Sequence, residues 1–238
     1  MKNFIKKNLP EKYYTVLRDC KIALTDGYAR KSYSTEGEDI LLNSIFRDKK
    51  SGFYVDVGAN HPKRASNTYL FYKKGWKGIN IDANPGSMKL FNKIRPDDIN
   101  IECAISDKKE TLTYFIFNDS SLNTFSSEIA LSIDGKEHYR IIQEKQIETC
   151  PLSEVLDKYL PDGSEIDFLS VDVEGFDLNV IKSNNWDKYR PEIVLVEIHY
   201  INFNELANYE ICKYLTSNGY NIISKLINTV VFKDVKNN

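Results

Sequence analysis

Short apolar segments that carry an acidic residue near their ends recur along this chain, and they constrain its fold more than any other feature. Four of them, separated by helix-like segments, cover 52–58, 78–82, 166–173 and 193–198 and carry Asp56, Asp82, Asp172 and Glu197. Apolar runs of this length are typical of strands buried on both faces of a parallel sheet. Ligands bind at the carboxyl ends of such strands, so the four acids are predicted to share one sheet edge that holds the functional site.

Strand-like and helix-like segments alternate, which predicts an α/β fold with a parallel sheet. Helices are predicted at 38–46, 66–74, 85–94, 151–160, around 178–181, and at 204–217. Further strands are predicted at 100–105, 111–117 and 139–149, with a polar loop at 118–135 and a terminal hairpin of 220–224 and 229–232. A single domain is predicted over 33–238, and residues 1–32 are predicted to form a helical N-terminal extension.

Composition and charge exclude several function classes. The 238 residues include 32 Lys and Arg against 34 Asp and Glu, and this net charge of -2 does not favour a nucleic-acid-binding protein. No apolar run approaches ~18 residues, so no transmembrane segment is predicted, and the N-terminus lacks the features of a secretory signal. The four cysteines form no CxxC or zinc-ligand spacing and are predicted to be reduced, mostly buried thiols. These features are typical of a cytoplasmic protein.

The loop after the first strand lies between a strand and a helix, as a nucleotide-binding loop does, yet Gly58 is its only glycine. Dinucleotide-binding loops use several glycines so that the backbone can approach a pyrophosphate. Asn60 and Pro62 stand where small residues would be needed, so the loop suits a ligand without phosphates, such as an adenosine that carries an amino-acid tail. Asp56 is predicted to orient the loop or bind an ammonium group, and Asp82 is placed to bind both ribose hydroxyls.

Several segments resemble the FkbM methyltransferase family, namely YSTEGEDILL, FYVDVGANHP, GWKGINIDANP, DFLSVDVEGFDLNVI and PEIVLVEIHY. They cover about residues 33–200. The resemblance implies a Rossmann-like class I methyltransferase fold, in which a mostly parallel seven-stranded sheet has an antiparallel terminal hairpin and helices on both faces. It also implies S-adenosylmethionine (SAM) as the methyl donor and a hydroxyl group, frequently on a sugar, as the acceptor.

The same resemblance implies contacts to the cofactor. Tyr33, Ser34 and Glu38 are expected near the methionine end of SAM, and Cys103, Ala104 and Ile105 are expected beside adenine. The predicted cofactor contacts are Tyr33, Ser34, Glu38, Asp56, Gly58, Asn60, Asp82, Ala83 and Ala104. His61 departs from the family pattern, in which a second small residue or glycine is common. It is predicted to contact the SAM carboxylate or the acceptor, and a packed histidine is the other interpretation.

Transfer to a hydroxyl requires a group that removes the hydroxyl proton. Asp172, Glu197 and His199 are expected to converge, because the last two lie two residues apart and share one face of an extended segment. Two interpretations stay open. Either Asp172 or His199 is the base and Glu197 orients it, or the three residues bind a divalent metal, Mg²⁺ or Mn²⁺, that lowers the hydroxyl pKa. In a structural interpretation, Glu197 and His199 only bond to loop backbone.

The acceptor is predicted to contact His61, Glu174 and Thr124, and Glu174 alternatively caps the following helix. The sequence as a whole predicts a SAM-dependent O-methyltransferase that acts on a carbohydrate, a surface glycan or its activated precursor, by in-line displacement. An NAD(P)-dependent oxidoreductase is one alternative, but the loop lacks the glycines it needs. A non-catalytic SAM-binding subunit is another, and the acids at the strand ends argue against it. Monomers and homo-oligomers are both compatible with the sequence.

Overall fold

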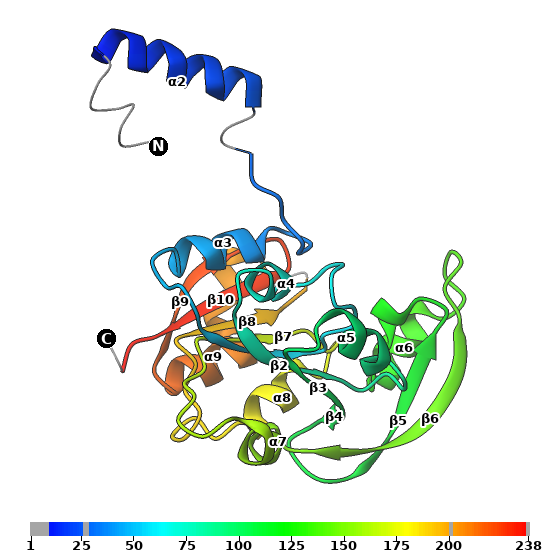
Figure 1. Ribbon diagram of the computed structural model, residues 1–238. Helices are drawn as coiled ribbons and strands as arrows, with labels where there is room; N and C mark the ends of the chain where they lie inside the picture. The colour runs from blue at the N-terminus through cyan, green and yellow to red at the C-terminus, as the bar shows by residue number, and fades with distance from the viewer. Residues whose placement is uncertain (1–9, 26–28, 200–201, 237–238) are drawn as a thin grey trace. The chain divides into compact units, whose positions relative to one another are not determined.

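Seven strands form the central sheet, in the order β3-β2-β1-β7-β8-β10-β9 (Figure 1). Their bounds are β1 Phe53–Val57, β2 Lys77–Asp82, β3 Ile99–Glu102, β7 Phe168–Val171, β8 Ile193–Glu197, β9 Tyr220–Lys225 and β10 Thr229–Asp234. Neighbouring strands pair in parallel, except that β10 runs antiparallel to β8 and β9. The topological switch point lies between β1 and β7. This confirms the predicted Rossmann-like sheet and its antiparallel terminal hairpin.

The structure, a computed structural model, describes residues 10–25, 29–199 and 202–236. The chain divides into two units, residues 1–32 and 33–238. In the first unit, the structure describes α2 (Glu11–Thr25). The predicted helical extension also covers residues 1–9 and 26–28, which lie outside the described residues. Every helix within the described residues is too short or too polar to span a bilayer.

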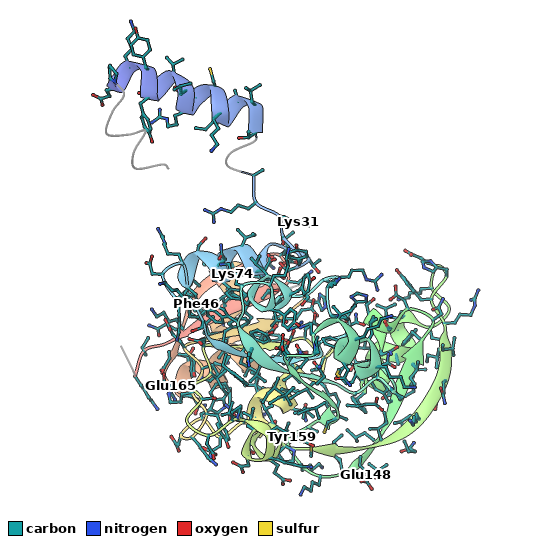
Figure 2. All side chains as sticks on the ribbon, viewed as in Figure 1. Lys31, Phe46, Lys74, Glu148, Tyr159 and Glu165 are labelled. Carbon is teal, nitrogen blue, oxygen red and sulfur yellow. The ribbon has the colours of Figure 1, made fainter. Side chains whose placement is uncertain are left out.

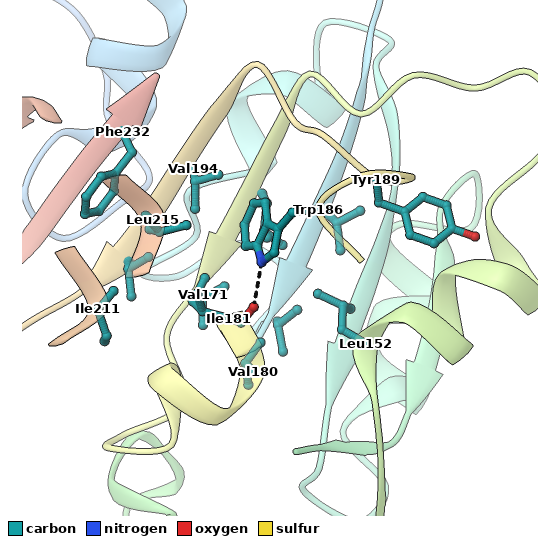
Figure 3. Packing of buried hydrophobic residues seen from close by; sticks show 14 of the residues in the cluster. Leu152, Val171, Val180, Ile181, Trp186, Tyr189, Val194, Ile211, Leu215 and Phe232 are labelled. Carbon is teal, nitrogen blue, oxygen red and sulfur yellow. Dashed lines mark hydrogen bonds between the residues drawn. The ribbon is translucent and has the colours of Figure 1, made fainter. Parts of the chain in front are cut away.

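Helices cover both faces of the sheet, because successive strand residues point to opposite sides. α7 (Leu152–Tyr159), α8 (Asp177–Ser183) and α9 (Glu210–Ser217) pack on one face. Figure 3 shows this core, in which Trp186 donates its indole N–H to the Ile181 carbonyl oxygen at 3.0 Å. α3 (Glu38–Ile45) and α4 (Tyr69–Tyr72) pack on the opposite face.

The core under α3 and α4 is rich in aromatic rings. Phe46, labelled in Figure 2, directly follows α3. Its ring stacks on Phe168 of β7 with 6.1 Å between the centroids and meets Trp76 edge-on at 5.5 Å. Phe71 of α4 contacts the same two rings. Aromatic pairs at this spacing add to the free energy of burial, so they hold α3 and α4 against the centre of the sheet.

Residues 104–150 form an insert with a small sheet of its own, in the order β4-β6-β5. Its strands are β4 Ala104–Ile105, β5 Thr111–Phe117 and β6 Ile141–Cys150, and β5 and β6 form the long antiparallel pair in Figure 1. The strand predicted at 100–105 is therefore two strands that belong to different sheets. Its apolar pattern is continuous, and pattern alone does not show that the chain changes sheets at Cys103.

The prediction of a polar loop at 118–135 is wrong in part. It contains a 3-10 turn, η1 (Ser120–Leu122), and a short helix, α6 (Ser127–Ile133). Ser126 caps α6, since its hydroxyl accepts the Ile129 N–H at 3.2 Å. The cap residue was present in the sequence, but the many polar residues around it masked the helical pattern.

Other predicted helices are shorter in the structure or divided. The helix predicted at 66–74 is α-helical only as α4, and the one predicted at 85–94 begins later, as α5 (Met88–Ile94). Gly86 explains the late start, because its φ of 83° cannot belong to a right-handed helix. Tyr209 has an extended backbone that separates η2 (Phe203–Asn208) from α9 and so divides the helix predicted at 204–217.

A buried polar network lies beside β1. Arg95 is fully buried and donates to Asp98 at 2.8 Å, to the Tyr54 hydroxyl at 2.8 Å and to Thr68 Oγ1 at 3.0 Å. The Tyr54 hydroxyl donates in turn to Asp98 at 2.8 Å, and the Thr68 hydroxyl donates to Asp56 at 2.8 Å. The guanidinium charge is thereby matched by a carboxylate, as burial of a charge requires. The network ties β1 to the segments that begin α4 and end α5.

Asp98→Ala is expected to lower the free energy of unfolding by about 3–5 kcal/mol, because it leaves the Arg95 charge buried without its carboxylate. Lys109→Ala is the matched control. It removes an ion pair with Glu154 in which both side chains are exposed, so little change in the free energy of unfolding is expected. Urea denaturation followed by circular dichroism measures both variants, and equal losses would contradict the role given to the buried pair.

Candidate functional site

A cavity of about 200 Å³ lies at the carboxyl edge of the central sheet. Gly58 and Asp82 line it beyond β1 and β2, whereas Asp172, Glu174 and Glu197 line it beyond β7 and β8. A smaller hollow of about 40 Å³ shares Asp172 and Glu197 with it. The cavity occupies the topological switch point, where open parallel sheets bind ligands.

Gly58 is the point at which the loops after β1 and β7 touch. Its φ of 85° lies in the left-handed region that favours glycine. A Cβ atom at this position would lie 1.6 Å from the carbonyl oxygen of Asp172. The neighbouring loop therefore excludes any side chain here, a reason for the glycine that the sequence did not reveal. The contact brings the β1 side of the cavity against the β7 side.

Asp82, at the end of β2, organises the loop after β1. Its two carboxylate oxygens accept the backbone N–H groups of Asn60 at 2.8 Å and Asn84 at 2.7 Å. Burial raises the pKa of Asp82, and the amide hydrogen bonds oppose that rise. A carboxylate offers about four acceptor positions, so Asp82 keeps the capacity to bind a ligand hydroxyl.

The wall beside Asp82 is apolar. Ala83, Cys103 and Ile105 line the cavity there. Ala104, predicted beside adenine, is buried and does not line the cavity. Successive residues of an extended segment point to opposite sides, so Cys103 and Ile105 face the cavity and Ala104 faces away.

Left-handed backbone gathers around the cavity. Among the described residues, four that are not glycine have a positive φ, and three of these line the cavity: Asn60 at 46°, Ala65 at 49° and Glu174 at 51°. Such conformations cost about 1–3 kcal/mol each and concentrate at functional sites. Contacts hold two of them in place, because Asn60 donates its N–H to Asp82 and the Glu174 carbonyl accepts the Thr124 hydroxyl at 2.7 Å.

The Asp172 and Glu197 carboxyls lie next to each other where β7 and β8 end. Asp172 is exposed to the cavity, and removal from bulk water together with the adjacent Glu197 carboxyl raises the pKa of Asp172 well above its ordinary value. Burial alone would raise the pKa of Glu197, but hydrogen bonds from His199 and Asp172 outweigh it and lower that pKa. The proton of this pair is therefore favoured on Asp172 and the charge on Glu197.

His199 is the cation of this group. Its Nε2 lies 3.0 Å from Glu197 Oε2 and 3.9 Å from Glu174 Oε2. The hydrogen bond to Glu197 raises the pKa of His199 to about 9, so the ring is an imidazolium at neutral pH. His199, one of the three predicted catalytic residues, is thus not in the state of a proton acceptor at neutral pH.

Glu174 has the acidity of a general base. Burial, followed by the nearby charge of Glu197, raises the pKa of Glu174 to about 7, and the charge of His199 opposes that rise. A catalytic base works best with a pKa near the operating pH. The predicted alternative role as a helix cap is not seen, because α8 has Phe176 as its N-cap and no side-chain cap. Asp177 binds the preceding loop instead, where it accepts the N–H groups of Val173 and Gly175, both at 3.1 Å.

Glu174, Glu197 and His199 form the group of described residues that can hold a metal ion, since one donor atom of each lies within 4.8 Å of the others. The sequence predicted Asp172 in place of Glu174. Carboxylate oxygen and neutral imidazole nitrogen suit a divalent ion such as Mn²⁺. A histidine ligand must be deprotonated, so the set fits a metal once His199 gives up its proton.

Two residues of the predicted loop site lie outside the cavity lining. Asp56 belongs to the buried network beside β1, where it accepts the Thr68 hydroxyl. His61 Nδ1 accepts the backbone N–H groups of Lys63 and Arg64, both at 3.0 Å. Both side chains lie outside the cavity and contact residues of the segment that follows β1.

Thr124 is also placed differently from the prediction. Its side chain is fully buried, donates to the Glu174 carbonyl and accepts the Ser126 N–H at 2.9 Å. An acceptor cannot reach it, although Ser120, Ser121 and Asn123 of the same loop line the cavity. A polar loop can thus be identified from its composition, whereas the residues that face inward depend on its turns.

The segment before α3 reaches the site through one residue that the sequence did not single out. Thr35 lines both the cavity and the adjoining hollow, and Glu38 lines the hollow only. Tyr33 and Ser34 line neither. They bind Asp39, with the Tyr33 N–H donating at 2.7 Å and the Ser34 hydroxyl at 3.0 Å.

An aromatic wall on the side of the insert was not predicted. Tyr114, Phe125 and Phe176 line the cavity, and the Phe125 ring centroid lies 4.5 Å from that of Tyr114 and 5.7 Å from that of Phe176. Ser120 of the insert donates its hydroxyl to Asn60 Oδ1 at 3.0 Å. The alternating pattern around Tyr114 predicts a strand, but it does not show which cavity that strand borders.

Comparison with known proteins identifies the family. The model of the FkbM methyltransferase domain matches residues 56–222 of this chain. The chain belongs to the FkbM methyltransferase family. The resemblance noted from the sequence motifs is thereby confirmed, and the chain is a methyltransferase of this family. No curated protein matches this FkbM chain in sequence.

Solved structures similar to this FkbM chain include two bacterial methyltransferases. One is a TehB-like SAM-dependent methyltransferase from Corynebacterium glutamicum, with 10% identity, a TM-score of 0.40 and coverage of 94% of this chain and 97% of that chain. The other is precorrin-6y C5,15-methyltransferase from Geobacter metallireducens, with 13% identity, a TM-score of 0.40 and coverage of 87% and 93%.

Glu174→Gln is expected to raise the melting temperature of this FkbM domain at pH 8 and to change it little at pH 4. The pKa of Glu174 in the folded protein, about 7, lies above the ordinary value of 4.5. Its ionisation therefore lowers stability as the pH rises from 4.5 to 7 and above, and the uncharged amide avoids this loss.

Thermal denaturation at both pH values measures the difference. Glu165→Gln, at an exposed position, is the control and is expected to show no such dependence on pH. A Glu174→Gln variant that melts below the wild type at pH 8 would contradict the repulsion inferred among the acids of the cavity.

Proposed function

We propose that this FkbM methyltransferase binds SAM in the cavity at the switch point and transfers the methyl group to a hydroxyl of a carbohydrate. The observation that carries the proposal is the division of this cavity into two halves. Gly58 and Asp82 border one half, and Asp172, Glu174 and Glu197 border the other. SAM supplies a methyl group that its sulfonium charge already activates. The chain has to bind and align both ligands and remove one proton.

The residues of the first half fit SAM. Asp82 has the acceptor capacity for ribose hydroxyls, and Cys103 and Ile105 offer an apolar surface to a base. From the other half, Glu197 offers a negative charge and Phe125 an aromatic face, and both attract a sulfonium. S-adenosylhomocysteine, the product, has no sulfonium charge, so the cavity as a whole favours the donor over the product.

The residues of the second half support a carbohydrate acceptor. The aromatic wall presents rings against which the C–H face of a sugar can pack, while Ser120, Ser121 and Asn123 supply hydrogen-bonding groups. Ligand sites generally combine an apolar or aromatic lining with a few oriented polar groups. The family resemblance, which implies acceptors that are frequently sugars, favours the same class.

Glu174 is the proposed base. The proton of the Asp172–Glu197 pair is favoured on Asp172, Glu197 is held between two donors, and His199 is a cation. Glu174, with a pKa of about 7, is the acid of this group placed to take up a proton near neutral pH. Asp172, Glu197 and His199 set the charge around it. Loss of the acceptor proton to Glu174 as the methyl group arrives avoids a free alkoxide.

A second route is favoured by the grouping of donor atoms within 4.8 Å in Glu174, Glu197 and His199. These three residues would hold a divalent ion, which would lower the pKa of the acceptor hydroxyl. In that case Glu174 is a ligand and no longer a base. The two routes differ in whether turnover requires metal.

Asp82→Ala is expected to weaken SAM binding by about tenfold or more, because it removes a charged acceptor of hydrogen bonds. Isothermal titration of SAM into the wild type and the variant measures the effect, with circular dichroism to verify the fold. Asp162→Ala, at an exposed position, is the control and should bind as the wild type does. Absence of SAM binding to the folded wild type would overturn the proposed function, and equal binding by Asp82→Ala would overturn the ribose contact.

Glu174→Gln is expected to reduce methyl transfer by roughly 10²–10⁴-fold, the usual contribution of a general base, while SAM affinity is kept. Transfer from methyl-labelled SAM to a panel of mono- and oligosaccharides measures turnover. In the wild type, kcat/KM should rise with pH through the pKa of Glu174 near 7.

The same assay separates the two routes. Turnover that withstands EDTA supports Glu174 as the base, whereas turnover that EDTA abolishes and Mn²⁺ restores supports the metal route. Labelling of amines or other non-sugar acceptors, with none of the sugars labelled, would contradict the carbohydrate assignment.

A further inference from the structure

Cys103 and Cys150 lie side by side although 47 positions separate them in the chain, with 2.9 Å between the two sulfur atoms. A disulfide bond measures about 2.05 Å, so the sulfur atoms need to approach by less than ~1 Å to form one. Both residues are half-buried, whereas Cys20 is exposed and Cys212 is buried. The prediction of mostly buried thiols is therefore wrong for three of the four, and two of them form a pair.

The pair stands at both connections of the insert. Cys103 lies between β3 of the central sheet and β4 of the insert, and Cys150 is the last residue of β6, just before α7. The chain therefore enters and leaves the insert through these two residues. The Cys103 N–H donates to the Asp82 carbonyl oxygen at 3.0 Å, which places the pair beside the cofactor half of the cavity.

The cavity, which the insert helps to enclose, is small for a ligand site. Its volume of about 200 Å³ lies below the roughly 300–1,000 Å³ typical of ligand sites. The insert supplies Tyr114 and Phe125 to the wall and contacts the rest of the domain through groups such as Ser120 and Thr124. A shift of the insert about its two connections would enlarge the cavity, as segments that cover an active site do.

We propose that Cys103 and Cys150 form a reversible disulfide that fixes the insert and slows cofactor exchange. The part of this inference that concerns the cofactor rests on the proposed function. The oxidant is a peroxide. The Cys150 thiolate attacks one peroxide oxygen, the O–O bond breaks, and a sulfenic acid and, after protonation, a water form. The Cys103 sulfur then attacks the sulfenic sulfur, loses its proton and releases the second water. Two thiols lose two electrons, hydrogen peroxide gains them, and a dithiol reductant reverses the reaction.

The contact between the two thiols assigns Cys150 as the first nucleophile. The hydrogen bond from Cys103 lowers the pKa of the Cys150 thiol, and the same contact with burial raises the pKa of Cys103. The thiolate is the reactive form of cysteine, so Cys150 reacts and Cys103 resolves.

Peptide mapping without reductant tests the bond. The full chain is treated with hydrogen peroxide, the remaining thiols are alkylated, and the digest is analysed by mass spectrometry. The expected result is a cross-linked pair of peptides that contain Cys103 and Cys150 and have lost two hydrogens, while Cys212 is alkylated. The cross-link should disappear with dithiothreitol and in Cys150→Ser. Alkylation of both residues in oxidised wild type would overturn the proposal.

Two readouts test the effect on the insert. Hydrogen exchange of residues 111–150 should slow on oxidation of the wild type and stay unchanged in Cys150→Ser, and this result does not depend on any ligand. The association rate of S-adenosylhomocysteine, measured by stopped-flow fluorescence, should fall by about tenfold on oxidation and recover with dithiothreitol. Cys20→Ser, which removes an exposed thiol, should behave as the wild type does.

The outcomes separate this inference from the proposed function. A disulfide that leaves both hydrogen exchange and association unchanged would overturn the role of the insert, whatever the protein methylates. A disulfide that slows exchange in a folded protein unable to bind S-adenosylhomocysteine would support the fixing of the insert, overturn its link to the cofactor and contradict the proposed function.

Discussion

The site depends on the contact between the loops that follow β1 and β7. A side chain at Gly58 would collide with the Asp172 carbonyl oxygen, so these two loops approach as closely as backbones can. Asp82 reaches the resulting cavity from β2, and Glu197 reaches it from β8. Asp82 and the acids that follow β7 and end β8 thus come within one small cavity, because a glycine lets the two loops approach. The aromatic core under α3 and the Arg95 network keep those strand ends fixed.

Much of the fold follows from residue patterns, because burial on both faces of a parallel strand leaves a continuous apolar run. β1, β2, β7 and β8 were predictable for that reason, as was the acid at each end. The insert was less predictable. Its strands alternate in polarity, and the switch from one sheet to another at Cys103 involves a single residue. Helix starts such as that of α5 depend on one backbone angle at Gly86, which apolar periodicity does not encode.

The site could be predicted at the level of elements and less well at the level of atoms. Asp82, Asp172 and Glu197 line the cavity because the strand-end rule places them there. Thr124 and Ala104 do not, because alternation along an extended segment turns their neighbours inward instead. Asp56 sits at a strand end like the others, yet its side chain points into the buried network that contains Arg95. A shift of one residue along a strand turns a side chain from the cavity to the core, so the two groups of residues differ by one residue of register. Packing across the whole domain decides that register.

The arrangement of charge explains why one acid of the site is left reactive. Several carboxyl groups in one cavity cannot all be ionised without strong repulsion. The raised pKa of Asp172 favours its protonated form, His199 supplies a cation to Glu197, and backbone amides stabilise the charge of Asp177. No retained proton, cation or set of backbone amides serves Glu174 alone, so its pKa stays near 7. Its strained backbone, held by the buried Thr124, fixes it facing the cavity. The residues around Glu174 thus set its acidity through the positions of their own charges, and a change at any of them is expected to shift the pKa of Glu174.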